Sequence, residues 1–474
     1  MELELVGRIH ERKLLNQALQ SKKPELIVMY GRRRIGKTFL IRQTLKKDIF
    51  FEITGIYNVP LKDQLANFHL KLSGLNPKLS PPNSWIEAFH NLELTVLKSR
   101  SKRKKVIFID EFPWLDTPRS NFLPAFENFW NGFVSKRSDM LVIICGSAAS
   151  YMIKKIVKNK GGLHNRLTER IRLNPFTLHE TERLLVKNGV RLTKYDITQL
   201  YMCMGGVPYY LEKITPGESV AQTIDRLCFS DNGFLRLEFD NLFASLFDQY
   251  ENHESIIRAL SKAKSGLTRT ALLAKTDSIS GGAFTKVLNE LTEAGFIEKT
   301  TPFKRIKDAT YRIIDEYSLF YLKYIEHTSA ARGNSWISMA QKQSYKSWSG
   351  ISFEAVCLKH IPQIKEALKI TGVNSNSSTW SARNQTKNAQ IDLLIDRDDN
   401  VINVCEIKFY NSQFSIDKKY GLELKNKLNS FREQTSTNKS LFLTIISTYG
   451  VKPNAHSTEI VQNEVTLEHL FKKL

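Results

Sequence analysis

ELIVMYGRRRIGKT, residues 25–38, joins an apolar run to a glycine-rich loop with the spacing G-x-x-x-x-G-K-[ST]. The loop follows an expected strand and opens an expected helix, which is the context that this phosphate-binding motif requires. Glycine lets backbone N–H groups and the helix N-terminus face phosphate oxygens. We expect Lys37 to reach the terminal phosphates and Thr38 to bind Mg²⁺. The expected nucleotide-binding loop consists of Gly31, Arg32, Arg33, Arg34, Ile35, Gly36, Lys37 and Thr38.

A second apolar run, VIFIDEF at residues 106–112, ends in two adjacent carboxylates. Asp110 can hold Mg²⁺ through water, and Glu111 can polarise the attacking water. The alternative is a solvated acidic pair at a strand end. A third run, LVIICGS, ends at Ser147. We expect its hydroxyl beside the γ-phosphate, unless Ser147 is an ordinary strand terminus.

Two arginines further along are candidates to neutralise the transferring phosphoryl group. Arg166 and Arg170 lie in LHNRLTERIRLNPF, although a surface arginine is the commoner case in a basic protein. No NKxD segment follows the loop to select guanine, so ATP with Mg²⁺ is the expected cofactor pair.

The wider pattern predicts an α/β multidomain protein. Short apolar runs at 25–30, 50–54, 105–110 and 141–146 alternate with helical patterns, which is typical of a parallel sheet. We therefore expect a P-loop core over residues 1–175, followed by a helical lid over 176–250 that is interrupted at 205–208.

Residues 251–330 change character. Three helical patterns precede a β-hairpin pattern, which is the order of a winged helix. Such a domain either contacts DNA directly or joins other protein parts, and the sequence leaves both open. A polar stretch then suggests a linker over 331–350.

These motifs together resemble the archaeal-type ATPases of the STAND/AAA+ lineage. The resemblance rests on LVGRIHERKLL at residues 5–15, the motifs above, LNPF, and GGVPYYL at 205–211. It implies that Gly7 and Arg8 lie near the adenine and that Pro208 borders the nucleotide from the lid. It covers roughly residues 1–330, winged helix included.

The remaining residues, 351–474, carry a second set of charged groups. Asp392 precedes Glu406 by one strand, a turn and the return strand, so an antiparallel hairpin would bring the two carboxylates together. Lys408 shares a strand face with Glu406 because the strand period is two. Glu354, on a preceding helix, can complete a Mg²⁺ or Mn²⁺ site.

This second set resembles the PD-(D/E)XK nuclease fold, a restriction-endonuclease-like α/β domain. The resemblance makes Asp392, Glu406 and Lys408 the catalytic set, with Gln390 and Tyr420 as accessories. The proline of the motif is replaced by Ile391. The alternative is a surface hairpin with an ordinary Glu–Lys pair, but CEIKF continues a buried run, where charged groups need a reason.

Composition bounds the remaining possibilities. The chain has 474 residues, 42% hydrophobic and 25% charged, which excludes collagen-like, mucin-like and wholly disordered proteins. Its net charge of +21 favours a polyanionic partner, either nucleic acid or an anionic membrane surface, and of these we expect DNA. Residues 351–474 hold 16 Lys and Arg against 13 Asp and Glu, so most of the excess precedes them. The run SRSKRKK, residues 99–105, is either a solvated loop or a nucleic-acid contact.

No apolar run approaches the roughly 20 residues of a membrane span, and no signal peptide is recognisable. The five cysteines are scattered along the chain, which argues against a structural zinc site. Their odd number also suits a reducing compartment, so we expect a cytoplasmic protein. The expected function is an ATP-hydrolysing, DNA-associated protein with a metal-dependent nuclease domain gated by the ATPase, as in mobile-element or defence systems. The alternative is a nucleotide-dependent signalling switch whose nuclease-like domain does not cut. Homo-oligomers are possible under both.

Overall fold

The computed structural model describes residues 5–157, 161–247, 249–263, 266–276, 281–304, 309–328, 336–382 and 389–474. The chain divides into two compact units, Met1–Asn174 and Pro175–Leu474. The first unit has the extent expected for the nucleotide-binding core. The finer boundaries within the second unit stay predictions.

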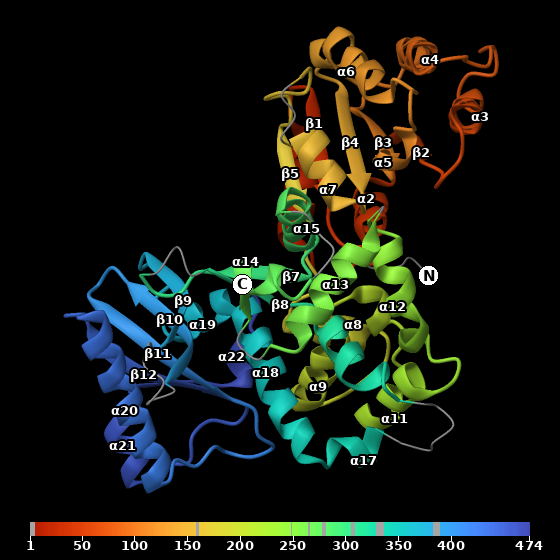
Figure 1. Cartoon of the computed structure of the whole chain (residues 1–474). Helices are drawn as coiled ribbons and strands as arrows, with labels where there is room; N and C mark the ends of the chain where they lie inside the picture. The colour runs from red at the N-terminus through yellow and green to blue at the C-terminus, as the bar shows by residue number, and fades with distance from the viewer. Residues whose placement is uncertain are drawn as a thin grey trace. The chain divides into compact units, whose positions relative to one another are not determined.

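Five parallel strands form the sheet of the first unit in the order β2-β3-β4-β1-β5 (Figure 1). The four strands expected from apolar runs are confirmed, whereas the fifth was missed because Ile171 is its one buried residue. The strands are β1 (Glu25–Tyr30), β2 (Ile49–Thr54), β3 (Lys105–Asp110), β4 (Met140–Gly146) and β5 (Glu169–Arg172).

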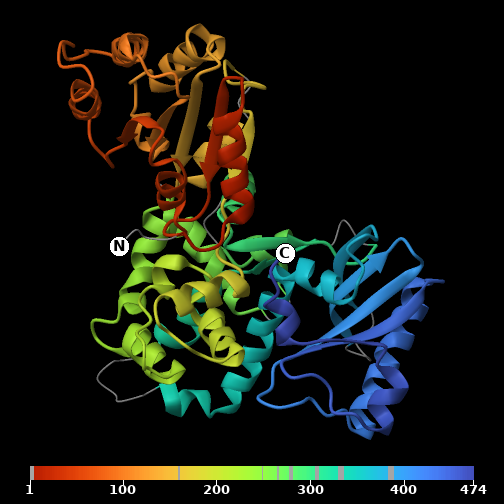
Figure 2. The same cartoon turned by 180° about the vertical axis from the view of Figure 1, so that it is seen from behind.

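Helices cover both faces of this sheet, as the two opposite views show (Figures 1 and 2). Alternate strand residues enter two separate cores because successive side chains point to opposite faces. α1 (Ile9–Gln20) and α2 (Lys37–Leu45) pack on one face. α3 (Leu61–Ser73), α4 (Trp85–Lys98) and α6 (Phe122–Gly132) pack on the other with a cluster of aromatic rings. Burial on both faces explains why the strands are apolar throughout.

The second unit begins with helices, as expected. They break at residues 205–207 and again at 230–233, both of which were predicted from the sequence. The helices are α8 (Leu178–Lys187), α9 (Lys194–Met204), α10 (Pro208–Leu211), α11 (Val220–Ile224) and α12 (Phe234–Ala244).

The helix and hairpin order expected after residue 250 is present. The helices α13 (Tyr250–Ser261), α14 (Arg269–Leu273) and α15 (Gly281–Glu293) precede an antiparallel hairpin of β7 (Ile297–Thr300) and β8 (Thr310–Ile313). The two-residue strand β6 (Leu267–Thr268) pairs with β8 to complete a sheet in the order β6-β8-β7. We refer to the hairpin and its described turn residues, 297–304 and 309–313, as the wing.

The linker expected over residues 331–350 is wrong for its described part. α17 (Trp336–Ala340) and α18 (Gln343–Lys359) occupy residues 336–350 almost entirely. Trp336 and Trp348 are buried against Phe320, and their rings provide the packing that the serine-rich sequence conceals. α18 then runs without a break into the part expected to be nuclease-like.

The C-terminal sheet is mixed, in the order β13-β12-β11-β10-β9. β10 (Gln390–Arg397) and β11 (Val401–Lys408) form the expected antiparallel hairpin, and β12 (Ser440–Ser447) runs parallel to β11. α20 (Lys418–Thr435) lies over this sheet, and β13 (Asn463–Val465) ends it.

The polar stretch that begins at residue 374 forms a strand, although its composition is typical of a loop. Ser375–Ser381 form β9, which pairs antiparallel with β10. Its residues are polar, and Trp380 alone is fully buried there, so the strand lacked an apolar signal. Residues 383–388 lie outside the described residues. Within the described part of the chain, no helix combines the length and apolarity needed to cross a bilayer.

Candidate functional sites

The phosphate loop lies between β1 and α2, at the carboxyl end of the parallel strands. Gly31 has φ 149° and Gly36 has φ 86°, both in the region that favours glycine. A Cβ on Gly31 would lie 2.3 Å from the carbonyl oxygen of Leu173. The Lys37 ammonium donates to the carbonyl oxygens of Gly31 (3.0 Å) and Arg32 (2.9 Å). The loop therefore curls around the one amine that the motif supplies.

Thr38 and Asp110 contact each other at the carboxyl ends of the parallel strands. The Thr38 hydroxyl donates to Oδ2 of Asp110 at 2.8 Å, although the two residues lie on α2 and β3. A hydroxyl and a carboxylate in contact are the ligand pair that Mg²⁺ takes in nucleotide sites of this kind. The residues present therefore fit a magnesium ion bound with nucleotide.

Glu111 and Ser147 also contact each other. Oε2 of Glu111 accepts from the Ser147 hydroxyl (2.9 Å) and from the Ser147 backbone N–H (3.1 Å). Glu111 itself has φ 45°, a left-handed conformation that is costly for a residue with a side chain and that clusters at functional sites. The contact holds the carboxylate near the strand tips, beside Asp110.

Apart from the phosphate loop, a cavity of about 580 Å³ lies in the C-terminal part of the second unit. Its walls come mainly from the helices α18 and α20 and the strands β10 and β11. We call it the carboxylate cavity, and its functional lining consists of Glu354, Gln390, Asp392, Glu406, Lys408, Tyr420 and Lys427.

Glu406 is the centre of a charge cluster. Its side chain is buried, with the Lys408 ammonium 2.8 Å from Oε1 and the Lys427 ammonium 2.6 Å from Oε2. Burial opposes its ionisation, but the two ammonium groups outweigh burial and lower the pKa of Glu406 to about 2. The Tyr420 hydroxyl donates to Oε1 at 2.6 Å. Glu406 in turn raises the pKa of Lys408, so this amine stays charged.

Glu354 and Asp392 have the opposite character. Burial raises the pKa of each, the charges of Asp392 and Glu406 raise that of Glu354 further, and the charge of Glu406 raises that of Asp392 further. Carboxylates gathered against their own repulsion are typical of sites that receive a cation.

A β-bulge directs Asp392 into this cavity. The pairing of β10 with β9 shifts between Ile391 and Leu394, so that these two residues share one apolar core. Asp392 lies inside the shift, next to the register position that pairs Leu393 with Cys405. Bulges commonly turn a side chain out of the regular alternation beside a site.

The metal ligands expected here do not form a ready-made set. Within the residues that the structure describes, no group of three or more His, Cys, Asp or Glu is arranged to hold a metal ion. Both carboxylate oxygens of Glu406 already contact an amine. A cation would therefore meet Glu354 and Asp392 first, and would reach Glu406 by displacing an ammonium group.

Comparison with known proteins bears on the front of the chain. Residues 5–214 match the family model described as an ATPase domain predominantly from Archaea. This stretch is an archaeal-type ATPase domain. The match supports ATP hydrolysis, and it covers less than half of the chain.

Other comparisons cover longer stretches of the chain. An uncharacterized protein of Methanocaldococcus jannaschii is 26% identical over 394 residues, which cover 82% of this chain and 83% of the relative. The Walker-type ATPase of Pyrococcus abyssi superposes with a TM-score of 0.50 at 17% identity, covering 68% of this chain and 97% of that one. The ORC2 protein of Aeropyrum pernix gives a TM-score of 0.41 at 15% identity, covering 76% and 98%.

Within the ATPase domain, the remaining expected residues differ in position. Arg8 is buried beside the phosphate loop, where Nη2 donates to the carbonyl oxygen of Ile35 at 3.3 Å. Arg166 lies three residues before β5, at the amino end of the sheet. The phosphate loop lies at the opposite, carboxyl end of the sheet. A strand of five residues is about 16 Å long, and a length of that order separates the two ends. Arg166 is therefore not brought to the loop of its own chain.

Pro208 begins α10 in the second unit, so its relation to the nucleotide stays a prediction. Arg170 pairs with Val28 in the middle of β5 and is exposed.

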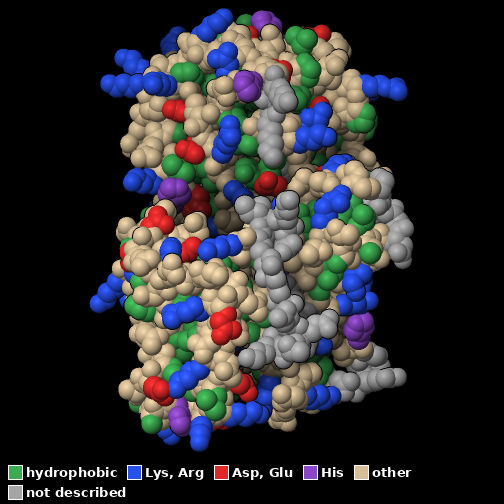
Figure 3. Space-filling view, turned by 60° about the vertical axis from the view of Figure 1, so that its left-hand side comes forward, with side chains coloured by type: hydrophobic (Ala, Val, Ile, Leu, Met, Phe, Trp, Pro, Cys, Tyr) green, Lys and Arg blue, Asp and Glu red, His purple; other side chains and the backbone are tan. Residues whose placement is uncertain are grey.

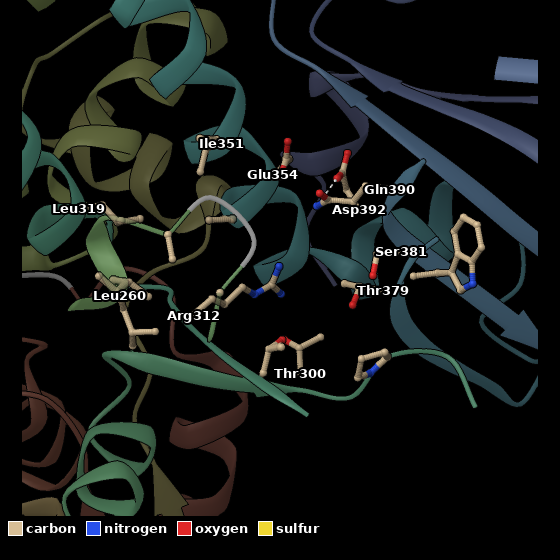
Figure 4. Close-up of a pocket in the computed structure, with 17 residues that line it drawn as sticks. Leu260, Thr300, Arg312, Leu319, Ile351, Glu354, Thr379, Ser381, Gln390 and Asp392 are labelled. Atoms are coloured by element: carbon tan, nitrogen blue, oxygen red, sulfur yellow. Dashed lines mark hydrogen bonds between the residues drawn. The ribbon is translucent and has the colours of Figure 1, made fainter. Parts of the chain in front are cut away.

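Two residues of the carboxylate region were missed. Lys427 shares a face of α20 with Tyr420 and Leu424 at the spacing i, i+4, i+7, a signal that was present in the sequence. Arg312 extends from β8 into a space bordered on its other side by Glu354 and Asp392 (Figure 4). Nothing local in the sequence of β8 indicates this, because the contact depends on how the wing packs.

Proposed function

We propose that this protein is an ATP-dependent, DNA-associated phosphodiesterase, in which the ATPase domain controls a metal-dependent nuclease-like site. The observation that carries the proposal is the shared cavity of Glu354, Asp392, Glu406 and Lys408, which come from α18, β10 and β11. Three acidic side chains gathered in one cavity with a charged amine, around a buried Glu406, have no structural necessity.

The chemistry of this site follows from its charges. A Mg²⁺ or Mn²⁺ ion would be held first by Asp392 and Glu354, and by Glu406 once an ammonium group is displaced; it would polarise the phosphate and its attacking water. Water adds to phosphorus as the bond to the leaving oxygen breaks, the water proton passes to a carboxylate of the site, and the leaving oxygen takes a proton from solvent. Lys408, kept as an ammonium by Glu406, stabilises the added negative charge on the phosphate oxygens.

Positive charge supports a nucleic acid as the substrate. The net charge is +21, and Lys and Arg side chains are spread over the visible surface in Figure 3 rather than confined to one patch. A distributed excess suits sequence-independent contact with a phosphate backbone. DNA is the substrate that we propose.

The helices α13–α15 and the wing act, in this proposal, as a winged helix that serves as a joint. The turn of the wing inserts Phe303 into the core of the C-terminal sheet, where its ring lies 5.3 Å from that of Phe431. The Phe303 N–H donates to the carbonyl oxygen of Thr379 on β9 at 2.8 Å. A displacement of this joint by ATP binding would change access to the carboxylate cavity.

Arg166 fits this scheme as a residue that serves another copy. Arg166 lies at the amino end of the strands, opposite the phosphate loop of its own chain. An arginine finger at this position would therefore complete the nucleotide site of a neighbouring copy in a homo-oligomer. Oligomers formed with ATP and lost in Arg166→Ala would support this arrangement.

The test compares DNA cleavage by the wild type, Glu406→Gln and Lys37→Ala, each with Mg²⁺ or Mn²⁺ and with or without ATP. Glu406→Gln is expected to abolish cleavage and retain ATP hydrolysis. Lys37→Ala is expected to lose ATP hydrolysis and the ATP dependence of cleavage. Intact DNA under every wild-type condition would refute the nuclease function.

One observation favours a second function, a nucleotide-dependent switch that does not cut. Glu406 already has both oxygens in contact with lysines, as a purely structural cluster would. In that case Glu406→Gln would destabilise the second unit without removing any cellular effect of the protein. Loss of that effect in a folded Glu406→Gln variant favours the nuclease instead.

A further inference from the structure

The wing forms one wall of a second cavity next to the carboxylate cavity. This wing cavity has a volume of about 180 Å³, and Figure 4 shows its lining. Its polar lining comes from three places: Thr300, Thr310 and Arg312 on the wing, Thr379 and Ser381 on β9, and Glu354, Gln390 and Asp392 on the carboxylate side. The two cavities share Glu354, Gln390 and Asp392 as lining residues, so they lie next to each other.

Among the described residues that line the wing cavity, Arg312 is the only cation. Its Nη2 donates to Oε2 of Glu298 on the neighbouring strand at 2.8 Å. Its Nε is buried and, among the described residues, has no hydrogen-bond partner. A guanidinium that uses one donor in an ion pair and keeps another without a partner is suited to bind a planar or tetrahedral oxyanion.

Thr300 adds a second donor to the same wall. Its hydroxyl is also buried and lacks a hydrogen-bond partner in the described part of the chain. Buried polar atoms are rarely left without partners, and an unfilled pair on one cavity wall indicates a ligand or ordered water. A volume of this size admits a phosphate group or several waters.

We propose that the wing cavity binds a backbone phosphate of the DNA strand, next to the phosphate that the carboxylates engage, and that Arg312 is its anchor. The inference rests on the proposed function, because the strand must pass through the carboxylate cavity. Arg312 positions the strand and takes no part in bond breaking. The wing thus contributes to substrate binding through the face that it turns toward the C-terminal sheet.

The test measures binding separately from cleavage. A short fluorescein-labelled DNA duplex is titrated with the full-length protein in Ca²⁺ at several salt concentrations, and its anisotropy is recorded. Arg312→Met is expected to lose about tenfold or more in affinity, since a hydrogen bond to a charged group is removed. Its salt dependence, as the slope of log K against log[salt], is expected to decrease by about one.

Two further variants keep the test decisive. Thr300→Val removes the second donor with little change in shape and is expected to weaken binding less than Arg312→Met. Glu298→Gln removes the ion-pair partner of Arg312 but lies outside the wing cavity, and is expected to bind DNA at least as tightly as the wild type. ATP hydrolysis and circular dichroism establish that each variant is folded.

The outcomes separate this inference from the proposed function. Unchanged affinity and salt slope in both Arg312→Met and Thr300→Val would overturn the phosphate site, even if the wild type cuts DNA. Arg312-dependent binding without any cleavage would support the phosphate site and refute the nuclease. If the duplex does not bind at all, both are refuted.

Discussion

Acidification is expected to destabilise the second unit at one buried histidine, His360. Its side chain is 1% exposed and lies between α18 and the first residue of α8. The ring donates from Nδ1 to the carbonyl oxygen of Val356 (2.7 Å), and Nε2 accepts from the Leu178 N–H (3.0 Å). A proton on Nε2 would face the N–H of Leu178, so both contacts require the neutral ring.

The size of the effect follows from the pKa. Burial lowers the pKa of His360 from 6.5 to about 4. In the unfolded chain the ring takes up its proton first, so stability is complete above pH 6.5 and is lost as the pH falls toward 4. Each pKa unit corresponds to about 1.4 kcal/mol, which gives a loss of about 3 kcal/mol over the whole window.

The assay is urea unfolding followed by tryptophan fluorescence at neutral and at mildly acidic pH. The variant His360→Gln is expected to be less stable at neutral pH but to lose about 2 kcal/mol less than the wild type on acidification to about pH 4.5. The carboxylates of the site titrate in both proteins, so their contribution cancels when the losses of unfolding free energy of the wild type and His360→Gln are compared. His327→Gln, at an exposed position, is the matched control and is expected to follow the wild type. Equal losses in all three proteins would refute the argument.

Three further perturbations address other parts of the account. Glu111→Gln is expected to retain ATP binding but to lower ATP hydrolysis by about a hundredfold, because the role that we predict for Glu111 is to polarise the attacking water. Phosphate release measures this rate, and a normal rate would contradict the assignment. Phe303→Ala is expected to lower the free energy of unfolding of the second unit by about 3 kcal/mol, since removal of a buried ring leaves a cavity. Urea unfolding that matches the wild type would contradict the role of the wing as a joint. Lys427→Met is expected to raise the pKa of Glu406 and to move the acid limb of the cleavage profile to higher pH, whereas Lys425→Met, which loses an exposed pair on the same helix, is expected to leave the profile in place.

The parts of both sites that local sequence determines were predicted. The contacts of Lys37 and Thr38 follow from a motif in which strand, loop and helix are adjacent. The approach of Asp392 to Glu406 follows from the register of one hairpin, since the turn between them is short. In each case the residues that must meet are close in sequence or lie at the carboxyl ends of parallel strands of one sheet.

What could not be predicted depends on packing between distant segments. Arg312 approaches the carboxylates because Phe303 docks on the C-terminal sheet, and no periodicity in β8 encodes that contact. β9 is a strand of polar residues that is recruited by β10, so apolar alternation gave no signal. The helices that replace the expected linker are held by the buried rings of Trp336 and Trp348.

The most direct test of the central claim is metal-dependent DNA cleavage by wild type and Glu406→Gln, prepared in parallel and matched for ATP hydrolysis. The account predicts that the wild type cuts in Mg²⁺ or Mn²⁺, that chelation of the metal stops the reaction, and that Glu406→Gln does not cut while it still hydrolyses ATP. Equal cleavage by both proteins, or none by the wild type, would contradict it.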